Sequence, residues 1–193
     1  MEWLRYGAQH YPDRICINEY TYNDIYGGVL HVASELIHLE SSRVAILSDN
    51  SVTMAIYVLA AMLAHKEVLL LNVHLKPNEI GNQLKQLGVT TVLHSKERYN
   101  QLPSLLRTIE FEPLESILSN LNLEDTFDWN FDDAVIAAIM NTSATTGQFK
   151  SVPLRWGQIS AHVQASQEVL GKTEQDNWLM VLPLFHVSGL SIL

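Results

Sequence analysis

Residues 43–73 read RVAILSDNSVTMAIYVLAAMLAHKEVLLLNV, and this stretch decides the fold. Its first part, 43–50, is a short β-rich run that ends in polar turn residues, which predicts a buried strand. Residues 51–66 are apolar on most sides of a helix, so a buried helix is expected there. Residues 67–73 predict a second apolar strand. A strand, a buried helix and a strand in this order are typical of a parallel sheet with helices on its faces.

The same alternation continues on both sides of this unit. Before it, Thr21 is a plausible N-cap of a helix, and Asp24 follows three residues later, as in a capping box. After it, residues 76–88 predict a helix with Pro77 in its first turn and Gly88 just past its end. A third strand is expected after Gly88. We therefore expect an α/β fold, a βαβ-type layered sheet with flanking helices.

We divide residues 1–193 into three parts of one partial domain. Residues 1–95 form the first βαβ part, and residues 96–130 are a polar, acidic connecting segment with one short helix. Residues 131–193 carry the two motifs described below.

The last part should again alternate strands and helices. A buried strand is expected from about Ala134, a helix over 153–171 and an apolar strand over 176–182. A turn from Pro183 to His186 and the start of a helix should follow.

Composition and charge exclude several classes of protein. Asp and Glu number 21 against 12 Lys and Arg, a net charge of −9, which disfavours binding to nucleic acid or to anionic membranes. No signal peptide is expected, because the N-terminus has neither a basic start nor an apolar run. No membrane span is expected, because His65, Lys66 and Glu67 interrupt the longest apolar stretch. Cys16 stands alone among apolar neighbours, which indicates a packed side chain in a reducing compartment, the cytoplasm. The histidines are scattered, so no metal ligand is predicted.

The stretch NTSATTGQFKSVPLRWG, residues 141–157, has the composition of a phosphate-binding loop. Hydroxyl groups and free backbone N–H groups can wrap a polyphosphate, and a lysine adds positive charge. The predicted context, with a strand before and a helix after, is where α/β proteins bind ligands. On composition alone, an ordinary Ser/Thr-rich turn is the simpler interpretation. The candidate nucleotide-binding residues are Thr142, Ser143, Thr145, Thr146, Gly147 and Lys150.

A second motif, VLPLFHVSGL, spans residues 181–190 and contains His186. A single histidine after an apolar strand is more often a hydrogen-bonded core residue than a catalyst. By itself the motif leaves both interpretations open.

Together, the two motifs resemble those of the adenylate-forming superfamily, the AMP-binding acyl-CoA synthetases. The family loop reads roughly Thr-Ser-Gly-Thr-Thr-Gly-x-Pro-Lys and holds the ATP phosphates. The chain departs from it at Ala144, where the family has glycine, and at Phe149, where the family has a small residue or proline. The resemblance implies ATP, Mg²⁺ and coenzyme A as cofactors and co-substrates. It places His186 at the carboxylate-substrate pocket as the catalytic residue.

Within this superfamily, the chain most resembles the o-succinylbenzoate–CoA ligases of menaquinone biosynthesis, in the form of the second motif and in the stretch from Glu67 to Leu84. It departs from them at His74, where these ligases generally have arginine. The resemblance implies that a carboxylate, ATP and coenzyme A form acyl-CoA, AMP and pyrophosphate through an acyl-adenylate. A homo-oligomer is left open. Two alternatives are a ligase for another aryl or acyl carboxylate and a degenerate, non-catalytic fragment.

Family members are much longer than 193 residues, so the resemblance implies the N-terminal part of the large domain, without the C-terminal lid. The adenine-binding, ribose-binding and metal-binding motifs of the family are absent from the sequence as well. Because catalysis needs such groups placed around the reacting phosphate, we expect the isolated chain not to complete the reaction.

Overall fold

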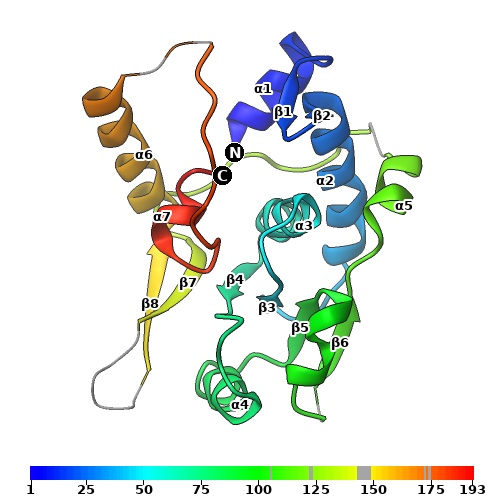
Figure 1. The fold of residues 1–193 in the computed structure, drawn as a ribbon, viewed down its shortest axis with the longest axis vertical. Coiled ribbons are helices and arrows are strands. Elements are labelled where there is room, and N and C mark those ends of the chain that lie inside the picture. Colours follow the sequence, from blue (N-terminus) through cyan, green and yellow to red (C-terminus); the bar gives the residue numbers. More distant parts are fainter. Residues whose placement is uncertain (105, 122–123, 143–148, 172, 174) are drawn as a thin grey trace.

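A six-stranded sheet forms the centre of the computed structural model, which describes residues 1–104, 106–121, 124–142, 149–171, 173 and 175–193 (Figure 1). The strand order is β6-β5-β3-β4-β7-β8. Neighbouring strands are parallel except for the pair β7 and β8, which is antiparallel. The bounds are β3 (Arg43–Leu47), β4 (Glu67–Leu70), β5 (Thr91–His94), β6 (Arg107–Glu110), β7 (Ile136–Thr142) and β8 (Lys150–Arg155).

Helices cover the sheet, and a separate two-stranded hairpin precedes α2. The described helices are α1 (Glu2–His10), α2 (Tyr22–Leu36), α3 (Val52–Leu63), α4 (Pro77–Gln86), the 3₁₀ helix η1 (Lys96–Gln101), α5 (Leu114–Ser119), α6 (Trp156–Leu170) and α7 (Val187–Leu190). The hairpin consists of β1 (Ile15–Ile17) and β2 (Tyr20–Thr21). The predicted α/β fold with a layered sheet is confirmed.

Local sequence signals set the helix ends where they were expected. The Thr21 hydroxyl accepts a hydrogen bond from the Asp24 backbone N–H at 3.2 Å. The Thr21 backbone N–H donates to the Asp24 carboxylate at 2.8 Å, which completes the predicted capping box of α2. Pro77 begins α4, and Gly88 just beyond its end has a positive φ of 64°. Such a φ strains other residues, so glycine suits this position.

The β3–α3–β4 unit forms the core, as residues 43–73 predict. Eleven of the twelve α3 residues are buried, all but Thr53. Figure 1 shows α3 and α4 on opposite sides of β3 and β4. The connections that leave these two neighbouring strands therefore run to opposite faces of the sheet. In open α/β sheets, a ligand crevice forms at such a switch point, outside the carboxyl ends of the strands.

The connecting segment 96–130 contains more structure than the sequence predicts. The expected short helix is α5, but η1 and β6 are also present. Strand β6 pairs with β5 at the edge of the sheet, with Thr91 opposite Arg107. Its sequence, RTIE, has no extended apolar run. An edge strand is held mainly by backbone pairing to one neighbour, so it leaves a weak sequence signal.

Two expectations for the last part are wrong. Residues 150–155 form β8, whereas a helix was expected from Pro153, and α6 begins only at Trp156. Proline is tolerated in β8 because this is an edge strand. Residues 176–182, expected as a strand, are irregular, and Leu179 is 81% exposed. An apolar run becomes a strand only where a partner strand accepts its backbone, and the described residues offer none there.

Candidate functional site

The candidate site lies at the carboxyl ends of the parallel strands. Strand β3 ends at Leu47 and leads into the turn that contains Asn50. Strand β4 leads into the turn that contains His74, and β7 ends at Thr142. Because the carboxyl ends of parallel strands share one edge of a sheet, these turns lie along the same edge.

Residues 182–189, which we call the elbow, lie over the ends of β3 and β4. The Asn50 side-chain amide donates to the Leu182 carbonyl at 2.9 Å. Its oxygen accepts from the Leu184 backbone N–H, also at 2.9 Å. On the β4 side, the His74 ring meets the Phe185 ring edge-on, with centroids 6.3 Å apart. The elbow therefore occupies the switch point between β3 and β4.

The predicted turn at Pro183 is present and requires glycine at position 189. The His186 backbone N–H donates to the Pro183 carbonyl at 3.0 Å. A Cβ on Gly189 would lie 2.2 Å from that same carbonyl oxygen, so any side chain there would force the turn apart. Helix α7 begins directly after His186.

His186 is exposed, whereas its neighbours Leu184 and Phe185 are buried. Its ring lies against Phe185, with centroids 4.7 Å apart. The interpretation as a packed core histidine is therefore wrong, and the imidazole is free to contact a ligand. Its catalytic role remains a prediction.

Two of the six predicted nucleotide-binding residues lie within the described structure, opposite each other. Thr142 ends β7 and Lys150 begins β8, and they pair across the two strands. The Thr142 hydroxyl donates to the Lys150 carbonyl at 3.3 Å. The Lys150 ammonium group is exposed and has no ion-pair partner among the described residues. Ser143, Thr145, Thr146 and Gly147 lie outside the described residues.

The context of this motif is partly as predicted. A buried strand does precede it, beginning at Ile136, near the expected Ala134. A strand, β8, follows it instead of a helix. No helix N-terminus is therefore supplied directly after Lys150, and a phosphate here would rely on the lysine, the hydroxyls and the backbone N–H groups.

A polar network beneath this motif was missed from the sequence. The Asn141 side-chain amide donates to the Gln83 side-chain oxygen at 2.7 Å. The Ser151 hydroxyl donates to the Asn141 side-chain oxygen at 2.6 Å. The network joins α4 to both strands that flank the motif. One signal was available: Gln83 stands between Ile80 and Leu84 on the buried face of α4, where an apolar residue is expected.

Near the described sheet, the acidic group of Asp49 has a partner and the thiol of Cys16 is packed. Among the described residues, no group of three or more His, Cys, Asp or Glu side chains could hold a metal ion. Asp49, which follows β3, is paired with Arg98 at 2.6 Å. Burial raises the pKa of the Cys16 thiol to about 12, which agrees with a packed, unreactive side chain.

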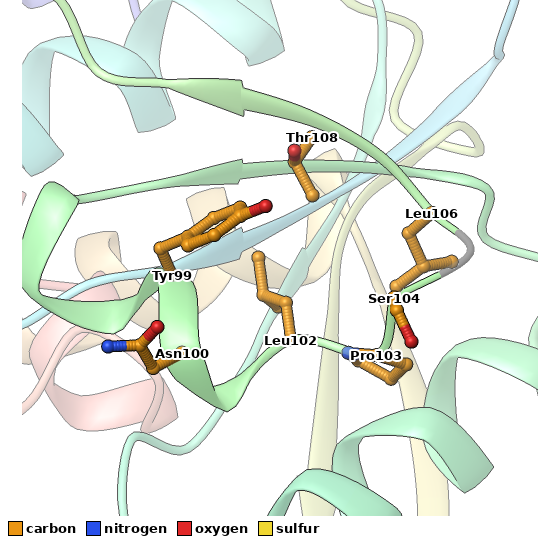
Figure 2. Close-up of a pocket in the computed structure, with 7 residues that line it drawn as sticks. All are labelled: Tyr99, Asn100, Leu102, Pro103, Ser104, Leu106 and Thr108. Atoms are coloured by element: carbon orange, nitrogen blue, oxygen red, sulfur yellow. The ribbon is translucent and has the colours of Figure 1, made fainter.

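A separate pocket of about 230 Å³ lies between η1 and β6 (Figure 2). It contains none of the predicted site residues and has no charged group in its lining. The lining residues are Tyr99, Asn100, Leu102, Pro103, Ser104, Leu106 and Thr108. Within the described ranges, no helix is long and apolar enough to cross a membrane.

The comparison with known protein families gives the class of this protein. The chain belongs to the AMP-binding enzyme family, which matches residues 4–193. Among its relatives, the 2-succinylbenzoate–CoA ligase of Lactococcus lactis subsp. lactis (strain IL1403) is 44% identical over 195 residues, covering 100% of this chain and 42% of the relative. The ligase of the same name from Staphylococcus aureus (strain MSSA476) is 34% identical over 221 residues, covering 99% and 44%.

Solved structures agree with this assignment. The o-succinylbenzoate CoA synthetase of Bacillus subtilis, in complex with the acyl-adenylate intermediate OSB-AMP, has a TM-score of 0.82 and 30% identity, covering 98% of this chain and 51% of that chain. The same enzyme in complex with ATP and magnesium ion has a TM-score of 0.81 and 29% identity, covering 98% and 53%. The predicted family is confirmed. The chain spans less than half the length of the two curated relatives it matches here.

Proposed function

We propose that this chain forms the phosphate-binding and acyl-binding part of a 2-succinylbenzoate–CoA ligase that acts in menaquinone biosynthesis in the cytoplasm. The observation that carries the proposal is the shared sheet edge. Lys150 and the exposed His186 of the elbow both lie at this edge. Lys150 has no ion-pair partner among the described residues. The names of the relatives support the choice of substrate.

The first step of the proposed reaction is adenylation. A carboxylate oxygen of 2-succinylbenzoate attacks the α-phosphorus of ATP, and the bond between this phosphorus and the oxygen that bridges to the β-phosphate breaks. The products are the acyl-adenylate and pyrophosphate. The carboxylate is ionised at neutral pH, so the step needs no general base to remove a proton.

The second step transfers the acyl group to coenzyme A. The thiol sulfur attacks the acyl carbonyl carbon, the bond to the AMP oxygen breaks, and the thiol proton passes to solvent. The acyl-CoA and AMP leave. His186 lines the acyl side of the site in this proposal, as the resemblance to the family implies, and its exposure leaves the ring accessible to a substrate.

The described residues fit a polyphosphate. Lys150 offers an exposed ammonium group with no carboxylate competing for it among the described residues. The Thr142 hydroxyl lies opposite and could donate to a phosphate only in exchange for its bond to the Lys150 carbonyl. Mg²⁺ would supply further charge neutralisation when bound with ATP. The described residues provide no carboxylate cluster for it, so we assign it no ligand in this chain.

The test is a chimera in which this chain replaces the region that it matches in the Lactococcus lactis ligase. We expect pyrophosphate release that depends on 2-succinylbenzoate, followed by formation of the acyl-CoA. The isolated 193-residue chain should show no turnover, since it covers only 42% of that ligase.

Lys150→Ala in the chimera should raise the KM for ATP by about tenfold, because one charge-assisted contact to the polyphosphate is lost. Lys85→Ala is the matched control, since Lys85 is an exposed lysine in the last turn of α4. A folded chimera that ignores 2-succinylbenzoate but uses another carboxylate would favour a ligase of different specificity. A folded chimera with no turnover on any carboxylate would favour the degenerate fragment.

A further inference from the structure

We propose that Asn50 is a positioning residue that holds the elbow, and with it His186, over the carboxyl ends of β3 and β4. This inference deepens the proposed function and rests on it for the role of His186. The hydrogen bonds of Asn50 join positions that are 132 and 134 residues apart in sequence.

The Asn50 side chain makes the two hydrogen bonds that a residue of a neighbouring strand would make. Its amide nitrogen donates to the Leu182 carbonyl and its oxygen accepts from the Leu184 N–H. In a parallel sheet, one residue likewise donates its N–H to the carbonyl that precedes its partner residue. Its own carbonyl accepts from the N–H that follows the partner residue. The amide therefore satisfies two backbone groups of an irregular segment that has no strand partner among the described residues.

Besides Asn50, local hydrogen bonds, apolar burial and the edge-on contact of Phe185 with His74 hold the elbow. Its described backbone hydrogen bonds are local ones, such as His186 N–H to the Pro183 carbonyl and Leu190 N–H to the His186 carbonyl. Burial of Leu184 and Phe185 anchors the elbow, but apolar burial is non-directional. Hydrogen bonds are directional, so the two bonds of Asn50 restrict how the elbow is turned and therefore where His186 lies.

Asn50 is itself held from both sides. Its neighbour Asp49 forms a bidentate ion pair with Arg98, in which the guanidinium nitrogens lie 2.6 to 2.9 Å from the carboxylate oxygens. Its other neighbour, Ser51, caps α3 by accepting from the Met54 backbone N–H at 3.0 Å. These contacts of the turn between β3 and α3 do not involve the elbow, and a support held in this way can orient the group it contacts.

The first experiment measures amide hydrogen exchange in the 193-residue chain. Asn50→Ala should accelerate exchange at Leu184 by about tenfold, because its N–H loses its acceptor. Asn50→Asp keeps an acceptor for Leu184 and should preserve part of the protection. Asn130→Ala is the control, since the Asn130 side chain bonds only locally, to Asp128. Unchanged exchange at Leu184 in Asn50→Ala would overturn the proposal.

The second experiment separates positioning from stability in the chimera. Asn50→Ala should raise the KM for 2-succinylbenzoate by about tenfold and leave the KM for ATP within about twofold, because the elbow faces the acyl side. Loss of folded enzyme alone would lower kcat and leave both KM values unchanged, and this result would also overturn the proposal. An inactive chimera would count against the proposed function. The exchange rate at Leu184 does not depend on activity, so it tests the role of Asn50 separately.

Discussion

Asn141→Ala should destabilise the fold, because it leaves the Gln83 side chain without a hydrogen-bond partner among the described residues. Gln83 is 1% exposed, and its side-chain oxygen accepts from Asn141 at 2.7 Å. Its side-chain nitrogen already has no hydrogen-bond partner among the described residues. The substitution therefore removes the remaining described partner of the buried Gln83 amide. Water cannot replace this partner without opening the core, so the loss is costly.

The magnitude follows from the burial of this one group. Leaving a buried acceptor unpaired costs about 1–3 kcal/mol, so we expect a loss of about 2 kcal/mol in the free energy of unfolding. For a chain of this length, that loss lowers the Tm by about 4–8 °C. Ser151 also loses its acceptor, but it is only half-buried and can bond to water instead.

A double-mutant cycle in the 193-residue chain tests the reasoning. Gln83→Met removes the buried amide and keeps an unbranched side chain of similar size, so the double variant Gln83→Met with Asn141→Ala should recover most of the loss. Urea unfolding followed by circular dichroism measures each variant, with Asn130→Ala as the exposed control. The reasoning is refuted if Asn141→Ala is as stable as that control, or if the double variant is no more stable than Asn141→Ala alone.

Gly189→Ala in the chimera should raise the KM for 2-succinylbenzoate, because the new Cβ would collide with the Pro183 carbonyl at 2.2 Å; an unchanged KM would show that the turn adapts. The Cys16 thiol, with its pKa raised to about 12 by burial, should react with a disulfide reagent at pH 8 about a thousandfold more slowly in the folded chain than in urea; equal rates would contradict this. Leu179 and Val181 are 81% and 70% exposed, so the 193-residue chain should self-associate and the double substitution to serine should weaken that association in sedimentation measurements; a monomeric parent chain at the same concentration would count against it.

Much of the fold could be predicted because its signals are local. The capping box at Thr21, the apolar run of α3 and the glycine after α4 each depend on residues a few positions apart. Such short-range patterns act before tertiary contacts form, so they can be recognised in the sequence. The phosphate motif and the elbow were recognised by family resemblance rather than by such physical patterns.

The errors occur where pairing between distant segments decides the structure. Residues 150–155 became β8 because β7 lies alongside and accepts their backbone, although Pro153 and the following residues fit a helix start. Residues 176–182 have the apolar character of a strand but no partner among the described residues, and they are irregular. Apolar character specifies burial, whereas a strand also needs a neighbour for its hydrogen bonds.

The sequence by itself determined the α/β class and most of the main elements, because periodicity and caps are properties of neighbouring residues, and it showed the two motifs through their resemblance to the family. Only the tertiary structure revealed that Asn50 holds the elbow and that Gln83 supports the base of the phosphate motif through Asn141. Asparagine and glutamine are common polar residues with no preferred partner along the chain. Their donors and acceptors gain a direction only when folding brings together segments 58 to 134 residues apart.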